Sequence, residues 1–531
     1  MTDILLDILR THLADQEVGP DDDFYAMGGD SLIALRVVSD AQGQGIPISL
    51  RDLLYYPTAH GLAEFLQSAG SSASDGHPVP AGVAFDLLPP GDRALIPEGV
   101  ADALPATALQ VGMIYLCETS GDAQLYQSLI GWKTVGRFDK ALFRQALSEL
   151  CARHPALRTY IDLGRFSAAT QLVRAEVEPP LSVESLPEAD PDKATELVRK
   201  WREERLNRRI DWTRAPMFRC HVVAEPESFQ VTLATHHAIV DGWGFGQLIV
   251  DLLTIYDARL RGVVVDLPQL PFTAHRDFAI AEKEALASHE AAVFWRAQAD
   301  VPTLLIGQER FGATANAVGQ AGFSVEPELL DRLRDAARGA EVSLKAFVLG
   351  VHAWALGKWS GRGRDIVTGV VINIRPETPG SDLVVGLHLN TIPMRFGQLA
   401  GSWADLAREA LAAERHAAPY RTYPLAEIEN QLGRAAFDVT FNFTNFHVYQ
   451  DLDSLHALRV CDWWVFGKPS FPFRVDFEVE GTESGSRVLV DFDPGLVAPE
   501  SVRDYVDIYR KALAAAAQDP TAAAGIEAVE A

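Results

Sequence analysis

The pattern of apolar and polar positions divides the chain into a short helical segment and a much longer segment that mixes helices and strands. Within residues 1–67, apolar side chains recur three or four positions apart, the spacing of an amphipathic helix, and no stretch alternates as a strand does. Three groups of residues carry this spacing: Ile4, Leu5, Ile8, Leu9 and Leu13; Ile33, Val37 and Val38; and Leu62, Phe65 and Leu66. We therefore expect a small all-α domain at 1–67.

Beyond residue 83 the pattern predicts both strands and helices. Residues 229–235 alternate apolar and polar side chains, as a half-buried strand does. Further strands are predicted at 370–374 and 487–492, and helices at 140–151 and 402–415. Strands and helices in this mixed order favour one large α/β or α+β domain built as two lobes.

A segment of different composition separates the two predicted domains. Residues 68–82 are rich in Ser, Gly, Ala and Pro, the composition of a flexible linker. A long surface loop would have a similar composition, but the pattern changes from helical to mixed across this segment, which favours a linker. We place the large domain at 83–525, with an amino-terminal lobe at about 83–270 and a carboxy-terminal lobe at about 271–525.

Composition and charge narrow the class of protein. Among 531 residues, 48% are hydrophobic and 22% are charged, which is ordinary for a soluble globular protein. No apolar run reaches the roughly 18 residues that a membrane span needs. The first residues are acidic and amphipathic, unlike a signal or transit peptide, so we expect a cytoplasmic protein with no membrane partner.

The net charge of −25 argues against nucleic acid as a partner, because phosphate binding needs a basic surface. Residues 1–68 hold 11 acidic and 3 basic residues, which suits a module that docks on basic patches of partners, or simply a soluble one. The four cysteines are scattered and form no CxxC pair, so we expect buried free thiols at Cys117, Cys151, Cys220 and Cys461.

A first chemical motif lies in the small domain, at Gly28-Gly29-Asp30-Ser31-Leu32. Two glycines permit a tight turn, and Asp30 and Ser31 are good residues for the start of the helix that follows. Ser31 would lie at a helix amino terminus, where free N–H groups and the helix dipole favour an anion. The alternative is that Ser31 only caps the helix.

This motif resembles the phosphopantetheine attachment site of acyl and peptidyl carrier proteins. Residues 46–54 and 56–58 are similar to the second half of that family, so the resemblance covers nearly all of 1–67. It implies a small all-α, four-helix carrier domain with 4'-phosphopantetheine attached covalently to Ser31. A phosphopantetheinyl transferase would be the partner that attaches it.

The second motif follows the predicted strand at 229–235 and consists of two histidines, an aspartate and a glycine: His236, His237, Asp241 and Gly242. It resembles the HHxxxDG signature of condensation domains of nonribosomal peptide synthetases, which belong to the chloramphenicol-acetyltransferase-like superfamily. Other segments resemble further motifs of that family in the same order: 105–113, 153–159, 276–278, 385–395, 423–425 and 441–443. The resemblance implies a two-lobed α/β fold around a tunnel that the donor and acceptor carriers enter from opposite mouths.

The chemistry of amide formation limits what the histidine motif must do. The attacking α-amine has a pKa of about 7.7–8.0, so roughly a third of it is neutral near pH 7.5. What remains is to orient the amine, to stabilise an oxyanion and to remove a proton. The resemblance implies His237 for positioning the amine and accepting its proton, without a covalent intermediate on the histidine. His236 is expected to be structural.

The other residues of the motif have two interpretations each. Asp241 either orients His237 or forms a buried ion pair that fixes the loop, and we favour the ion pair, with Arg158 as the first candidate partner and Arg395 as the second. Gly242 would let backbone approach the thioester and could offer its N–H to the oxyanion. Many family members have Ser where this chain has Gly244, and Asn390 is either a polar contributor or a structural cap.

Several functions remain open within this resemblance. Peptide-bond formation leads, followed by epimerisation of the carrier-bound residue, whose domains share the histidine motif. A module that only presents Ser31 to other enzymes is a third possibility. Heterocyclisation domains carry paired aspartates instead of the histidines, which this chain does not. Residues 110–113 and 390–393 resemble a condensation subtype that accepts a D-configured donor, and the product would be a natural product such as a siderophore.

The order of the two domains also predicts partners. A carrier directly before a condensation domain holds the donor, so Ser31 should carry the upstream acyl or peptidyl group. The acceptor would come from a downstream carrier protein. No segment resembles an adenylation domain or a Walker phosphate loop, so an upstream adenylation domain, with an epimerisation domain as a possible addition, would supply the donor. No metal-ligand spacing is found among the histidines.

Overall fold

The computed structural model describes residues 1–13, 15–69, 83–271, 274–305, 318–445, 447–468, 471–479 and 485–525. The small amino-terminal domain consists of α1 (Thr2–Leu13), α2 (Ser31–Gly43), α3 (Leu50–Tyr55) and α4 (Ala59–Ala69). These helices confirm the predicted all-α domain. Most of the predicted linker, residues 70–82, lies outside the described residues.

The four helices of the small domain pack around one apolar core. Leu5, Leu9, Phe24, Val38 and Leu62 are fully buried in it. These residues include members of all three helical groups in the sequence, because apolar positions three and four apart face the same side of a helix. A Cβ atom on Gly29 would lie 2.4 Å from the Phe24 ring, so the turn before α2 needs glycine there.

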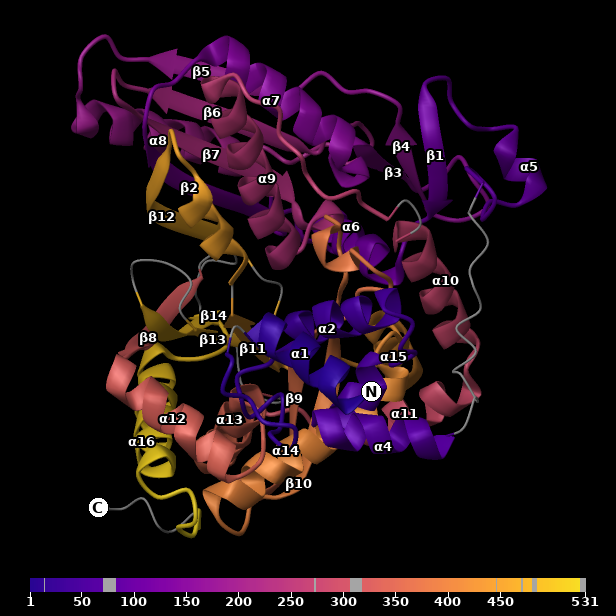
Figure 1. The fold of residues 1–531 in the computed structure, drawn as a ribbon, viewed down its shortest axis with the longest axis vertical. Coiled ribbons are helices and arrows are strands. Elements are labelled where there is room, and N and C mark those ends of the chain that lie inside the picture. Colours follow the sequence, from indigo (N-terminus) through magenta and orange to yellow (C-terminus); the bar gives the residue numbers. More distant parts are fainter. Residues whose placement is uncertain are drawn as a thin grey trace.

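The amino-terminal half of the large domain is built on a five-stranded sheet with strand order β12-β2-β7-β6-β5. Helices α7 and α9 pack side by side on it, and a three-stranded sheet, β1-β4-β3, lies at one end (Figure 1). The elements of this half are α5 (Pro90–Arg93), β1 (Val100–Pro105), α6 (Ala108–Ser120), β2 (Gln127–Val135), α7 (Lys140–Arg153), η1 (Pro155–Arg158), β3 (Thr159–Asp162), β4 (Thr170–Arg174), β5 (Leu181–Ser185), α8 (Pro191–Leu206), β6 (Phe218–Ala224), β7 (Ser228–His236), η2 (His237–Ile239) and α9 (Gly242–Arg261).

The carboxy-terminal half is built on a six-stranded sheet with strand order β10-β9-β11-β13-β14-β8. Its elements are α10 (Ala274–Ala287), α11 (His289–Ala299), β8 (Gly319–Val325), α12 (Pro327–Gly339), α13 (Leu344–Ser360), β9 (Arg364–Asn373), η3 (Ser381–Leu383), β10 (Leu389–Gln398), α14 (Trp403–Ala417), η4 (Ala418–Tyr420), α15 (Leu425–Leu432), β11 (Val439–Asn445), η5 (His447–Ser454), β12 (Arg459–Gly467), β13 (Phe473–Val479), β14 (Ser486–Phe492) and α16 (Pro499–Gln518). The predicted strands and helices all coincide with elements of the structure.

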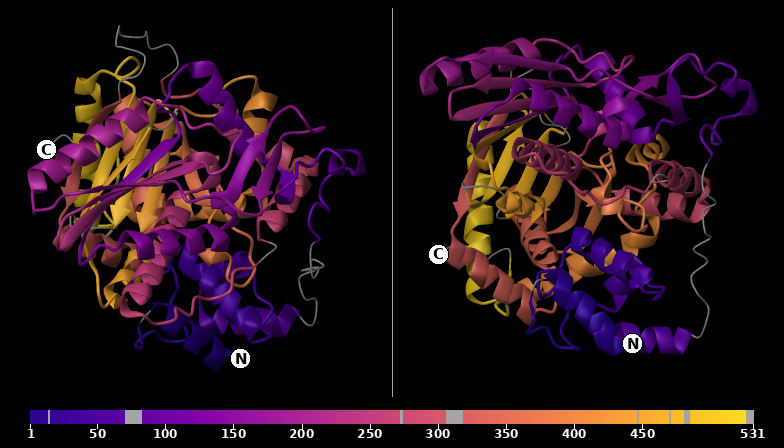
Figure 2. Two further views of the ribbon diagram at one scale, coloured as in Figure 1. Left: turned by 90° about the horizontal axis from the view of Figure 1, so that it is seen from above. Right: turned by 45° about the horizontal axis from the view of Figure 1, so that its top comes forward.

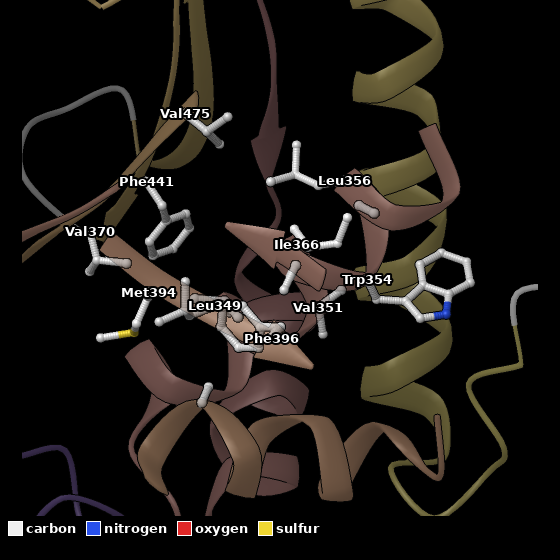
Figure 3. Packing of buried hydrophobic residues seen from close by; sticks show 14 of the residues in the cluster. Leu349, Val351, Trp354, Leu356, Ile366, Val370, Met394, Phe396, Phe441 and Val475 are labelled. Atoms are coloured by element: carbon white, nitrogen blue, oxygen red, sulfur yellow. The ribbon is translucent and has the colours of Figure 1, made fainter. Parts of the chain in front are cut away.

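Helix α13 forms the centre of the larger core. Residues 346–357 of this helix are all buried and, apart from His352, apolar, because the six-stranded sheet, α14 and α16 surround it. Figure 3 shows Leu349 and Val351 beside Ile366 and Phe396 of the sheet, whereas the Trp354 ring points away from these strands and packs against Trp403 of α14. This core gives the carboxy-terminal half a rigid sheet on which site residues can be held.

One strand crosses between the halves. β12 comes from the carboxy-terminal half of the sequence, yet it pairs antiparallel with β2 in the five-stranded sheet. The division at residue 270 therefore does not describe this strand. The carrier domain lies against the carboxy-terminal half, below the five-stranded sheet, as Figure 1 and the right-hand view of Figure 2 show. Within the described ranges, no helix is both long and apolar enough to cross a membrane.

Candidate active site

The histidine motif lies where a strand of the five-stranded sheet turns into a long helix. β7 ends at His236, one 3-10 turn follows, and α9 begins at Gly242 with Asp241 as its cap. The His237 N–H donates to the Tyr126 carbonyl at 2.9 Å, and the Val240 N–H donates to the His237 carbonyl at 3.3 Å. The backbone of the motif is thereby fixed to the residue that precedes β2 and to itself.

A cavity of about 880 Å³ connects the histidine motif to both halves of the large domain and to the carrier. His237, Gly242 and Trp243 contribute from the amino-terminal half. The carboxy-terminal half contributes residues of β9, β10, β11 and β13, among them Thr391, Asn442 and Arg474. The carrier contributes Gly28, Gly29, Asp30, Leu32, Ile33 and Arg36. The sequence motifs of the two domains therefore face one cavity.

His237 is held in its neutral form by its surroundings. Burial lowers its pKa below the ordinary value, the Asp241 carboxylate opposes this shift, and the Arg474 guanidinium adds to it. A neutral imidazole can accept a proton at neutral pH. The side chain is partly exposed, and it lies on the cavity wall.

His236 faces away from solvent into the amino-terminal core, with 2% of its surface exposed. Its Nδ1 accepts from the Ala238 N–H at 3.1 Å, and its Nε2 lies 3.5 Å from Cys117 Sγ. Burial lowers its pKa to about 3. These contacts support the structural interpretation of His236.

Asp241 joins the two halves through a buried ion pair. Its Oδ1 accepts from the Arg375 guanidinium at 2.8 Å, and neither side chain is more than 1% exposed. The carboxylate also accepts from the backbone N–H groups of Gly244 at 2.7 Å and His388 at 3.0 Å, and the Asp241 N–H donates to the Gly386 carbonyl at 2.9 Å. This supports the ion-pair interpretation of Asp241.

The expected partners of Asp241 were wrong. Arg158 donates to main-chain carbonyls at the end of α7, including that of Cys151 at 2.9 Å. Arg395 forms an exposed ion pair with Asp365 at 2.6 Å. The partner is Arg375, two residues beyond the end of β9, because the antiparallel pairing of β9 with β10 brings that strand end to the interface between the halves.

The side-chain amide of Asn390 supports the loop beneath the cavity and does not point into the cavity. Its Nδ2 donates to the carbonyls of Arg421 at 2.9 Å and Tyr423 at 2.7 Å, and its Oδ1 accepts from the Thr391 N–H at 2.9 Å. The structural-cap interpretation of Asn390 is therefore favoured.

The glycines at the start of α9 keep the backbone close to its neighbours. Gly242 is the first helical residue and lies on the cavity wall, where the first N–H groups of a helix have no intrahelical partner. A Cβ on Gly244 would lie 3.1 Å from Asp241 Oδ1 and 3.2 Å from Val240 Cγ2, which is tighter than ordinary packing. Glycine at 244 is therefore matched to this close approach.

The carrier motif has the local geometry that its residues predict. Gly28 has φ of +101°, which suits glycine, and Ser31 is the first residue of α2. Asp30 caps the helix, and its carboxylate accepts from the N–H groups of Leu32 and Ile33, both at 2.9 Å. The four cysteines are buried free thiols, as expected.

Comparison with known families identifies the class of protein. Residues 100–527 match the condensation domain family, and residues 2–66 match the phosphopantetheine attachment site family. The chain therefore belongs to the condensation domain family and carries a phosphopantetheine attachment domain before it. Condensation domains of nonribosomal peptide synthetases are amide-forming acyltransferases, and this pair of domains supports peptide-bond formation in such synthetases.

Curated relatives that match nearly the whole chain include the following two synthetases. The AMB antimetabolite synthetase AmbE of Pseudomonas aeruginosa is 32% identical over 533 residues, covering 97% of this chain and 24% of that protein. A dimodular nonribosomal peptide synthase of Bacillus subtilis is 27% identical, covering 98% of this chain and 22% of that protein. The chain thus spans about a quarter of the length of these relatives.

Solved structures share the fold of the large domain. The condensation domain of the Monacolin K polyketide synthase MokA aligns with a TM-score of 0.67 at 16% identity, covering 81% of this chain and all of that chain. The first condensation domain of the calcium-dependent antibiotic synthetase aligns with a TM-score of 0.63 at 18% identity, covering 80% of this chain and 98% of that chain. These likenesses confirm the two-lobed α/β fold.

Two charged residues near the motif were not found from the sequence. Arg375 directly follows a predicted strand, which is a signal for a residue at a sheet edge but not for its partner. Arg474 lies on the cavity wall in β13, in ion pairs with Asp476 at 2.6 Å and Asp491 at 2.9 Å. Arg474 precedes Asp476 and Glu478 in a strand where apolar and charged side chains alternate, which in the sequence looks like a solvent-exposed face. Only the fold places its side chain, which is 28% exposed, on the cavity wall.

Proposed function

We propose that this chain transfers an acyl or peptidyl group from its own carrier domain, tethered at Ser31, to the amine of a carrier-bound aminoacyl thioester. The observation that supports this most is the shared cavity, which the residues around Ser31 line together with His237 and Gly242. A module that only presents Ser31 to other enzymes would have no use for a cavity that the carrier shares with His237.

The residues around the cavity suit a phosphopantetheine arm on Ser31. The dipole of the 13-residue helix α2 favours a phosphodiester at its amino terminus. The cavity beside this helix end is also lined by Gly242, His237 and apolar side chains such as Leu109 and Met113. When bound, the arm supplies the thioester that activates the acyl carbonyl.

In the proposed mechanism, His237 positions the amine and accepts the proton that the amine loses as the C–N bond forms. It then returns this proton to the departing thiolate as the C–S bond of the thioester breaks. Its lowered pKa keeps the imidazole neutral for this task. The Gly242 N–H, at the amino terminus of α9, is our candidate for stabilising charge on the carbonyl oxygen. The ion pair of Asp241 with Arg375 holds the loop and takes no proton.

Three further partners follow from this proposal. A phosphopantetheinyl transferase would modify Ser31, an upstream adenylation domain would supply the donor, and a downstream carrier would bring the acceptor. An epimerisation domain upstream is the expected addition if the donor has the D configuration. Epimerisation by this chain itself is the second candidate function, because the same histidine motif could exchange the α-proton of the tethered residue.

The test is a loading and extension experiment on the full chain. A phosphopantetheinyl transferase and a peptidyl-coenzyme A donor are offered to the wild type and to Ser31→Ala, then an aminoacyl-pantetheine acceptor is added, and products are identified by mass spectrometry. We expect an extended peptide that depends on Ser31. Loading followed only by a change of configuration would favour epimerisation, and loading with neither product would leave a presenting module.

A further inference from the structure

We propose that Trp243 and Asp382 form a docking site that selects the chain's own carrier domain through Arg36 and couples its docking to the loop that bears His237. This inference rests on the proposed function, because it concerns delivery of the donor from Ser31. It gives a role to Trp243, the residue directly after the glycine of the histidine motif, which the proposed mechanism leaves without one.

The first contact of this docking site is an ion pair between the two domains. Arg36 Nε of α2 lies 2.9 Å from Asp382 Oδ2 in η3, with the two side chains 30% and 10% exposed. The same guanidinium lies over the Trp243 ring, 5.7 Å from its centroid. Arg36 therefore contacts a carboxylate and an aromatic face at once, a combination that the planar guanidinium suits better than lysine.

Trp243 connects this contact to the histidine motif. Its indole N–H donates to the Asp382 carbonyl at 2.7 Å, which fixes η3 against the start of α9. Trp243 and Val250 form an apolar cluster against which Leu32, the residue after Ser31, packs together with Tyr449 and Leu452 of η5. Trp243 thus contacts the helix that begins at Ser31. It is also the residue directly after Gly242 on the wall of the cavity.

Further contacts hold the carrier on either side of Ser31. The Leu50 N–H at the start of α3 donates to Glu377 Oε2 at 2.8 Å, and Arg421 pairs with the same carboxylate at 2.9 Å. Arg415 Nε donates to the Leu54 carbonyl at 3.0 Å. Asn445 Nδ2 donates to Asp30 Oδ2 at 3.3 Å, in the turn that precedes Ser31. These contacts place the carrier, and among the interdomain contacts named here Arg36 with Asp382 is the pair of opposite charges whose exchange tests selectivity.

The experiment is a charge exchange in the full chain, with Arg36→Glu, Asp382→Arg and the double variant. Asp192→Arg makes the same change of charge at an exposed position in α8 and is the matched control for Asp382→Arg. Each variant is given its donor in two ways: loaded on Ser31, or as a soluble acyl-pantetheine thioester in a Ser31→Ala background. Single-turnover extension is measured by mass spectrometry, and backbone protection of 31–36 and 381–383 by hydrogen exchange.

We expect each single variant to slow extension from Ser31 at least tenfold and to reduce protection of both segments, while the double variant recovers most of both. Extension of the soluble donor should fall far less, and Asp192→Arg should resemble the wild type. Single variants at the wild-type rate, a double variant no better than the singles, or an equal loss with the soluble donor would overturn the proposal. If no variant or wild type extends any donor, the proposed function fails, and hydrogen exchange alone decides whether this docking site exists.

Discussion

The buried ion pair between Asp241 and Arg375 makes a quantitative prediction about stability. The two charges lie 2.8 Å apart with almost no exposure, so removing one leaves the other buried without its counter-charge. Breaking such a pair costs about 3–5 kcal/mol. We expect Asp241→Asn to lose unfolding free energy at the upper end of this range, because Arg375 then has no counter-charge. Arg375→Met should lose less, because Asp241 still accepts from the Gly244 and His388 N–H groups.

The double variant and a surface pair complete this test. Asp241→Asn with Arg375→Met removes both charges, so its loss should be well below the sum of the single losses. Arg395→Met breaks the exposed pair with Asp365, where the side chains are 39% and 42% exposed, and should cost no more than about 1 kcal/mol. The free energy of unfolding is measured by urea titration with tryptophan fluorescence. Equal losses for Asp241→Asn and Arg395→Met, or additive losses in the double variant, would refute this reasoning.

Two further predictions concern other parts of the fold. Burial lowers the pKa of His352 to about 3, so unfolding takes up a proton between that value and the ordinary 6.5, and the stability present above pH 6.5 declines as the pH falls. Between pH 7.5 and pH 5, the free energy of unfolding measured by urea titration should therefore fall about 2 kcal/mol less in His352→Gln than in the wild type. The same pH dependence in both proteins would contradict this. Gly29→Ala should destabilise the carrier domain by about 1–3 kcal/mol, because the new Cβ would lie 2.4 Å from the Phe24 ring, and faster hydrogen exchange in α2 would report this loss. Gly43→Ala is the control, because a Cβ there would have nothing within 4 Å and should not strain its neighbours.

Local patterns in the sequence predicted much of the secondary structure, because periodicity depends on neighbours three or four positions apart in helices and two apart in strands. The pairing of β12 with β2 joins residues more than 300 positions apart and leaves no local signal. The five-stranded sheet could therefore not be assembled from the sequence, and the predicted lobes missed the strand that crosses between them.

The residues of the candidate site were likewise predictable where they are close in the sequence and not where they are far apart. Ser31, His236, His237, Asp241 and Gly242 were found because each motif is contiguous and its chemistry depends on spacing along the chain. Arg375 is 134 positions from Asp241, and the sequence favoured Arg158 and Arg395 as partners instead. A buried charge needs a partner, so the ion pair itself was predictable, but its identity depends on the strand order at the interface.

The most direct test of the central claim is the single-turnover rate of extension in His237→Ala and His237→Gln, with the donor loaded on Ser31 and saturating acceptor. A residue that positions the amine and takes its proton contributes about 10²–10⁴-fold. We predict a loss of that size in both variants, with Ser31 loading at the wild-type level and unfolding free energies within about 1 kcal/mol of the wild type. Extension within a few-fold of the wild-type rate in both variants would contradict the role assigned to His237.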